Sequence, residues 1–80
     1  MKDIIKLDSR DYTKNSLVKV EERSYKLETS SLYVRGGFLS DGRTFIDPSG
    51  GPMLVEGEYL PEADAYIESI NNGIITFKES

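Results

Sequence analysis

The sequence predicts a mainly β fold, built as a small antiparallel meander or a barrel-like sheet. Short runs that alternate apolar and polar residues recur along the chain, which is the pattern of half-buried strands. Asp-Gly, Asn-Gly and proline-glycine segments separate these runs and are typical of turns. With 80 residues, we expect a single small domain over residues 1–80.

The first apolar run covers residues 4–7 and predicts a strand. Ile5 and Leu7 lie two positions apart, so both side chains fall on one face. Residues 8–15 are polar, with Asp, Ser, Thr and Asn side chains that suit a loop or a single helical turn.

The second run predicts a strand whose core face carries Val18 and Val20. Tyr25 and Leu27 follow on the opposite parity. A change of parity inside one strand would move the core face to solvent. We therefore expect a turn or a bulge over residues 21–24.

The most specific local signal is the Asp-Gly pair at residues 41–42, which predicts a hairpin with a two-residue type I′ turn. That register places Phe38 directly opposite Phe45. Glycines 36 and 37 interrupt the first strand of the hairpin and indicate a bulge or a close backbone approach.

The middle of the chain predicts brief elements separated by irregular connections. Residues 47–52 contain two prolines and two glycines and are expected to be irregular. Residues 53–55 form a short apolar run, and residues 56–58 are expected to turn.

Residues 61–72 permit two interpretations. A short helix would begin at Pro61 and place Ala63, Tyr66, Ile67 and Ile70 on one stripe. A hairpin would instead join two strands through the loop Asn71–Gly73 and pair Ile67 with Phe77. The hairpin is favoured, because Asn-Gly followed by Ile-Ile-Thr-Phe is typical of β structure.

The expected core consists of the apolar side chains that recur along these runs. They are Ile5, Leu7, Val18, Val20, Leu27, Leu32, Val34, Leu39, Ile46, Leu54, Ile67, Ile70, Ile75 and Phe77.

The composition limits the chemistry available to the chain. It has no His and no Cys, which excludes the Ser-His-Asp triad, the cysteine nucleophile and thiolate zinc sites. We therefore expect no enzyme, no cofactor and no metal site.

Charge is divided unevenly along the chain. Residues 1–43 carry nine Lys/Arg against seven Asp/Glu, whereas residues 44–80 carry one against seven. The net charge of −4 argues against direct nucleic-acid binding. No apolar run reaches the roughly 18 residues of a membrane span, and no leader is visible, so we expect a cytoplasmic protein without a membrane partner.

Two sets of candidate site residues emerge. The first could bind a small anionic ligand through an aromatic ring, two guanidinium groups and a glycine-rich loop: Tyr33, Arg35, Arg43, Ser49, Gly50 and Gly51. The second is an acidic set that could meet a protein partner: Glu56, Glu58, Glu62 and Asp64.

The stretch over residues 33–60, with Ile46–Pro52 at its centre, resembles segments of small uncharacterised β proteins of gut bacteria and their phages. The resemblance implies a small accessory β protein and assigns no role to any residue.

These observations favour a non-enzymatic protein-interaction module that binds a protein partner. One alternative is a small homo-oligomer that sequesters a nucleotide-like anion. The other is a structural subunit of an assembly.

Overall fold

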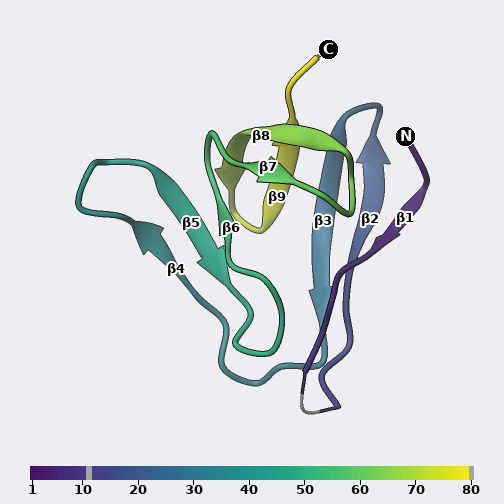
Figure 1. The fold of residues 1–80 in the computed structure, drawn as a ribbon, viewed down its shortest axis with the longest axis vertical. Helices are drawn as coiled ribbons and strands as arrows, with labels where there is room; N and C mark the ends of the chain where they lie inside the picture. The colour runs from purple at the N-terminus through teal and green to yellow at the C-terminus, as the bar shows by residue number, and fades with distance from the viewer. Residues whose placement is uncertain (11, 80) are drawn as a thin grey trace.

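The computed structural model describes residues 1–10 and 12–79, and within them it contains strands and turns but no helix. Figure 1 shows the nine strands in chain order. They are β1 (Ile4–Lys6), β2 (Asn15–Glu21), β3 (Ser24–Thr29), β4 (Arg35–Phe38), β5 (Thr44–Asp47), β6 (Leu54–Val55), β7 (Tyr59–Leu60), β8 (Ala65–Asn71) and β9 (Ile74–Phe77).

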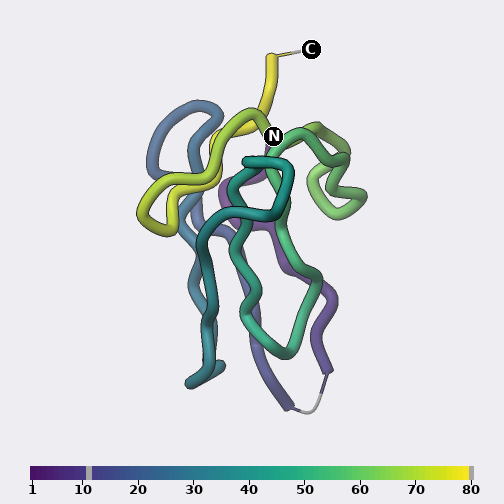
Figure 2. Tube along the Cα trace, turned by 90° about the vertical axis from the view of Figure 1, so that its left-hand side faces the viewer, coloured from purple at the N-terminus to yellow at the C-terminus, as the bar shows by residue number. Residues whose placement is uncertain are grey.

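The strands form two antiparallel sheets, which confirms the mainly β fold. Six strands form a curled half-barrel in the order β1-β2-β3-β9-β8-β7. The other three form a small sheet in the order β4-β5-β6. The β4–β5 hairpin projects from the rest of the molecule, to the left in Figure 1 and toward the viewer in Figure 2.

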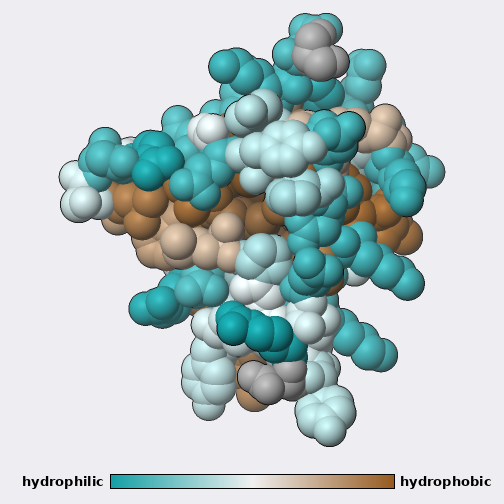
Figure 3. All heavy atoms as spheres, viewed as in Figure 1, coloured by the Kyte–Doolittle hydropathy of each residue, from teal (hydrophilic) through white to brown (hydrophobic). Residues whose placement is uncertain are grey.

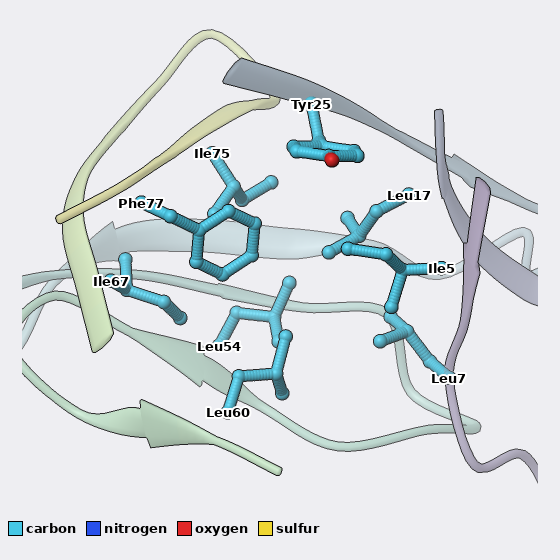
Figure 4. Close-up of a cluster of buried hydrophobic side chains, with 9 residues drawn as sticks. All are labelled: Ile5, Leu7, Leu17, Tyr25, Leu54, Leu60, Ile67, Ile75 and Phe77. Atoms are coloured by element: carbon cyan, nitrogen blue, oxygen red, sulfur yellow. The ribbon is translucent and has the colours of Figure 1, made fainter. Parts of the chain in front are cut away.

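The core lies inside the curl of the large sheet, and Leu54 of the small sheet packs into it (Figure 4). Tyr25 and Phe77 are fully buried and meet edge to face, with ring centroids 5.5 Å apart. The Tyr25 hydroxyl donates a hydrogen bond of 2.5 Å to the carbonyl oxygen of Lys2. The buried cluster comprises Ile5, Leu7, Leu17, Tyr25, Leu54, Leu60, Ile67, Ile75 and Phe77.

The prediction that Val18 and Val20 form the core face of the second strand was wrong. Leu17 is fully buried, whereas Val18 is half-buried and Val20 is 51% exposed. The pairing of β2 with β3 shifts between Lys19 and Glu21, so Val20 is the extra residue of a β-bulge. The bulge and the turn that follows it confirm the irregularity expected over residues 21–24.

Leu32 and Val34 were also expected in the core, and the structure places both on the surface. They precede β4, the strand of the small sheet that lies farthest from β6. Leu54 of β6 reaches the core, but β4 extends beyond it. The alternating pattern of residues 32–35 therefore belongs to an exposed segment that leads into an edge strand, and not to a buried face.

The Asp41-Gly42 hairpin is confirmed, but its expected register was wrong by one residue. Phe38 lies opposite Thr44, not opposite Phe45. The Leu39 amide donates to the Arg43 carbonyl, which leaves a three-residue loop. Gly42 has a φ of +91°, the conformation that ends such a loop.

Residues 61–72 contain no helix, so the hairpin interpretation is confirmed and the helical alternative was wrong. Residues 61–64 turn, and β8 then pairs with β9. The loop is a two-residue turn in which Asn72 and Gly73 both have positive φ, not the expected three-residue loop.

The expected pair of Ile67 and Phe77 is present in the β8–β9 hairpin. A register shift between Ile67 and Ser69 then makes Glu68 a bulge residue. Ile70 consequently lies opposite Ile75 and not opposite Ile74.

Candidate functional site

The most exposed apolar segment of the described chain leads into β4 and includes it. Leu32, Tyr33 and Phe38 are 88%, 76% and 75% exposed, and Val34 is 43% exposed. In Figure 3, apolar surface covers the side of the molecule where Figure 1 places the β4–β5 hairpin. We call residues 32–38 the β4 edge.

The β4 edge also presents unpaired backbone groups. β4 is hydrogen-bonded to β5 on one side only, since it is the first strand of its sheet. Leu39 pairs with Arg43 through its amide, so the alternation of an antiparallel ladder turns residues 35, 37 and 39 toward β5. The N–H and C=O groups of Gly36 and Phe38 therefore point away from the sheet.

The other strand edges carry the usual protection against pairing. β1 ends in Lys6 and is preceded by Lys2, and edge lysines discourage strand addition. β6 and β7 contain two residues each, with Pro52 and Pro61 close by. β4 contains neither lysine nor proline, so it is the least protected edge of the described sheets.

The structure does not bring the two arginines of the expected anion site together. Arg35 begins β4 and forms an ion pair of 3.2 Å with Asp47. Arg43 lies at the other end of the hairpin, where it contacts Asp41 at 2.7 Å and Glu58 at 3.4 Å. Hydrogen bonds from the Arg43 backbone N–H and guanidinium hold the pKa of Asp41 below its usual value. Both guanidinium groups are thus occupied by carboxylates.

The rest of the expected anion set lies toward the start of β4, at the opposite end of the hairpin from Arg43. Tyr33 is 76% exposed and lies two residues before Arg35, which pairs with Asp47 just before the loop of Ser49 to Gly51. The Ser49 backbone N–H donates to Asp47 Oδ1 at 2.9 Å and holds the pKa of Asp47 below its usual value. The Gly50 carbonyl accepts a 2.7 Å hydrogen bond from the Arg10 backbone N–H. Gly50 also packs close to Thr13, and Gly51 packs close to Asp8 and Asn15.

Gly51→Ala is expected to lower the free energy of unfolding by about 1–3 kcal/mol, as overpacking does. A Cβ atom at Gly51 would lie 2.5 Å from Asn15 Nδ2 and 2.9 Å from the Asp8 carbonyl oxygen. Urea unfolding measures the loss. Combining Gly51→Ala with Asn15→Ala should cost less than the sum of the two single changes, because the closest contact is then gone. Strictly additive costs would contradict this packing.

The four acidic residues of the expected partner-binding set make contacts within the chain. Glu58 pairs with an arginine, as described above, and Glu62 accepts a 3.2 Å hydrogen bond from the Asp8 backbone N–H. Asp64 accepts a hydrogen bond from the hydroxyl of Tyr59. All four lie around the turns that flank β7.

Glu56 links two strands of the small sheet. Its Oε1 atom accepts hydrogen bonds of 3.0 Å from both the backbone N–H and the hydroxyl of Thr44. These bonds favour the carboxylate, and they hold the pKa of Glu56 below its usual value. The same contact satisfies the amide at the start of β5.

Acid is expected to loosen the small sheet. The pKa values of Asp41, Asp47 and Glu56 are depressed in the folded chain, so their stabilisation is present at neutral pH. It is lost as pH falls below about 4 and through the lowered folded pKa values. The protection factor of the Thr44 amide, which is its intrinsic exchange rate at each pH divided by the observed rate, should fall between pH 7 and pH 3 when followed by NMR. Glu56→Gln should flatten this pH dependence, and an unchanged profile in that variant would contradict the assignment.

Sequence reasoning missed the β4 edge as a surface, because it assigned Leu32 and Val34 to the core. A signal was present in the two adjacent glycines at residues 36 and 37. A strand with two glycines and no lysine or proline has little side-chain protection along its edge.

Comparisons with known proteins add no relative to this picture. No protein-family model, curated protein or solved structure matches the chain. Over residues 1–10 and 12–79, no group of three or more acidic side chains is placed to hold a metal ion. The same residues include no helix long and apolar enough to cross a membrane.

Proposed function

We propose that this chain is a non-enzymatic protein-interaction module that binds an extended segment of a protein along the β4 edge. One observation carries the proposal. β4 is an unprotected edge strand, and large apolar side chains stand exposed beside its outward-facing backbone groups. Such an edge is the structural requirement for binding by strand addition.

The β4 edge also defines what an added strand would need. Main-chain hydrogen bonds to Gly36 and Phe38 would give affinity for any extended backbone. Val34 and Phe38 are four positions apart in the sequence, and each is two positions from Gly36. Alternation along an extended chain therefore places all three residues on one face. The absent side chain at Gly36 leaves room there, so the added strand is expected to present large apolar residues to this face.

The geometry gives less support to the anion-binding alternative. Arg35 and Arg43 are separated along the hairpin, and each is paired with a carboxylate. An anion would compete with those carboxylates for the guanidinium groups, whereas a protein strand on the β4 edge would leave both ion pairs in place.

A photo-crosslinking amino acid in place of Phe38 tests the proposed surface. On irradiation in cell lysate, we expect it to capture a protein through an extended segment that mass spectrometry can map. The matched control carries the same amino acid at Val20, which is exposed on a different sheet.

Capture from position 38 must also depend on the outward-facing backbone groups of β4. A second substitution, Gly36→Pro, removes an outward-facing N–H and should abolish capture from position 38. Equal capture from positions 38 and 20, or capture that survives Gly36→Pro, would count against strand addition at β4.

A further inference from the structure

We propose that the strand added to the β4 edge is β4 of a second copy of this chain, paired antiparallel about a two-fold axis at Gly36. This inference rests on the proposed function and names the partner of the same edge. It would join the two small sheets into one continuous six-stranded sheet, since each copy contributes β4, β5 and β6.

The outward-facing backbone groups support this register. The backbone groups of Gly36 and Phe38 point away from β5, as the ladder pattern requires. Val34 directly precedes β4 and would continue this alternation in the proposed pairing. Centring the two-fold axis on Gly36 lets the two glycines exchange both hydrogen bonds. Each Val34 then lies opposite Phe38 of the second copy, and all three outward positions are paired.

The cross-strand side-chain contacts also favour the register centred on Gly36. The aromatic ring of Phe38 would cover the β-branched Val34 and the bare backbone of Gly36 in the second copy, a stabilising type of cross-strand contact. Shifting the axis to Phe38 would place the two Phe38 rings opposite each other and leave Gly36 facing Ser40. The Gly36-centred register is the one that pairs both exposed apolar residues of this face with apolar neighbours.

Charge does not oppose the pairing. In this register Arg35 lies opposite Gly37 of the second copy, so no like charges face each other directly. Arg35 is also neutralised within its own chain by Asp47, at 3.2 Å. The four-residue length of β4 makes the interface small, so the association is expected to be weak and to grow with protein concentration.

Single cysteines test the register, because the chain has none of its own. Val34→Cys and Phe38→Cys are prepared as separate proteins, mixed in equal amounts and oxidised. Paired residues in an antiparallel ladder have Cα atoms about 5.5 Å apart, within the range of a disulfide. The mixed Val34→Cys/Phe38→Cys dimer should therefore exceed the half expected from random collision, as resolved by mass spectrometry.

The matched control is Ser69→Cys, an exposed position on β8. Mixed with Val34→Cys, it should give no more than random dimer. The unmodified chain should gain mass in light scattering as its concentration rises, and Phe38→Lys should suppress that gain.

Each outcome bears on one of the two proposals. A random distribution of crosslinked products, or a constant mass of one chain at all concentrations, would overturn pairing between copies. The proposed function would survive that result if the photo-crosslinker at position 38 still captured another protein. Capture of neither a second copy nor another protein would overturn both.

Discussion

Replacing Phe77 by alanine is expected to lower the free energy of unfolding by about 3–5 kcal/mol. Phe77 is fully buried in β9, the strand between β3 and β8 at the centre of the large sheet. The change removes its contacts within the core and its edge-to-face contact with Tyr25. A chain of this length has a total stability of about 4–12 kcal/mol, so the loss would be a large share of it.

Phe38→Ala provides the matched control, since it removes the same side chain from the surface. Phe38 is 75% exposed, and its loss should change stability by about 0.5 kcal/mol or less. Urea unfolding of the two variants at low protein concentration measures the difference. Similar losses in both would contradict the burial of Phe77.

Leu17→Ala is expected to cost about 2–5 kcal/mol. Leu17 is fully buried and lies opposite Ile5 on one side and Leu27 on the other. Alanine would leave a cavity between three strands of the half-barrel, where the sheet cannot easily collapse around it.

Val20→Ala is the control for Leu17→Ala, because both lie in β2 and only Leu17 faces the core. The surface position should lose about 0.5 kcal/mol or less. Thermal unfolding of both variants gives the order of the two effects. A larger loss of stability in Val20→Ala than in Leu17→Ala would contradict the structure and support the sequence-based prediction that Val20 faces the core.

The hairpins show how far sequence reasoning reaches. Asp-Gly and Asn-Gly each predict a turn, and both turns form at those residues. The predicted loop lengths were wrong in both hairpins: the Asp41-Gly42 loop has three residues instead of two, and the Asn72-Gly73 loop has two instead of three. Side-chain hydrogen bonds also influence the length of a turn. Asp41 accepts a 3.1 Å hydrogen bond from the Arg43 backbone N–H, which favours a three-residue loop. The Asn72-Gly73 turn closes in two residues.

The core face of β2 could not be decided from its own residues. Leu17, Val18 and Val20 are all apolar, so both parities offer apolar positions to the core. Pairing with Ile5 and Leu27 selects Leu17, and the bulge at Val20 ends the alternation. Neither the strand pairing nor the position of the bulge can be inferred from the periodicity of β2 alone.

The candidate site depended on three-dimensional placement in the same way. Sequence reasoning placed Arg35 and Arg43 in one candidate set, but it had no means to pair Arg43 with Asp41 and Glu58. It expected Val34, which directly precedes β4, in the core, although burial depends on which strand lies at the edge of a sheet. Sheet order is set by contacts between distant segments.

The central position of β9 has a consequence for how fast the chain folds. Ser24 of β3 and Thr76 of β9 share a 3.0 Å hydrogen bond across 52 residues of sequence. Closing so long a loop costs entropy before any contact between the two strands repays it. Refolding from denaturant should consequently take milliseconds to seconds, the range of domains dominated by distant strand pairs.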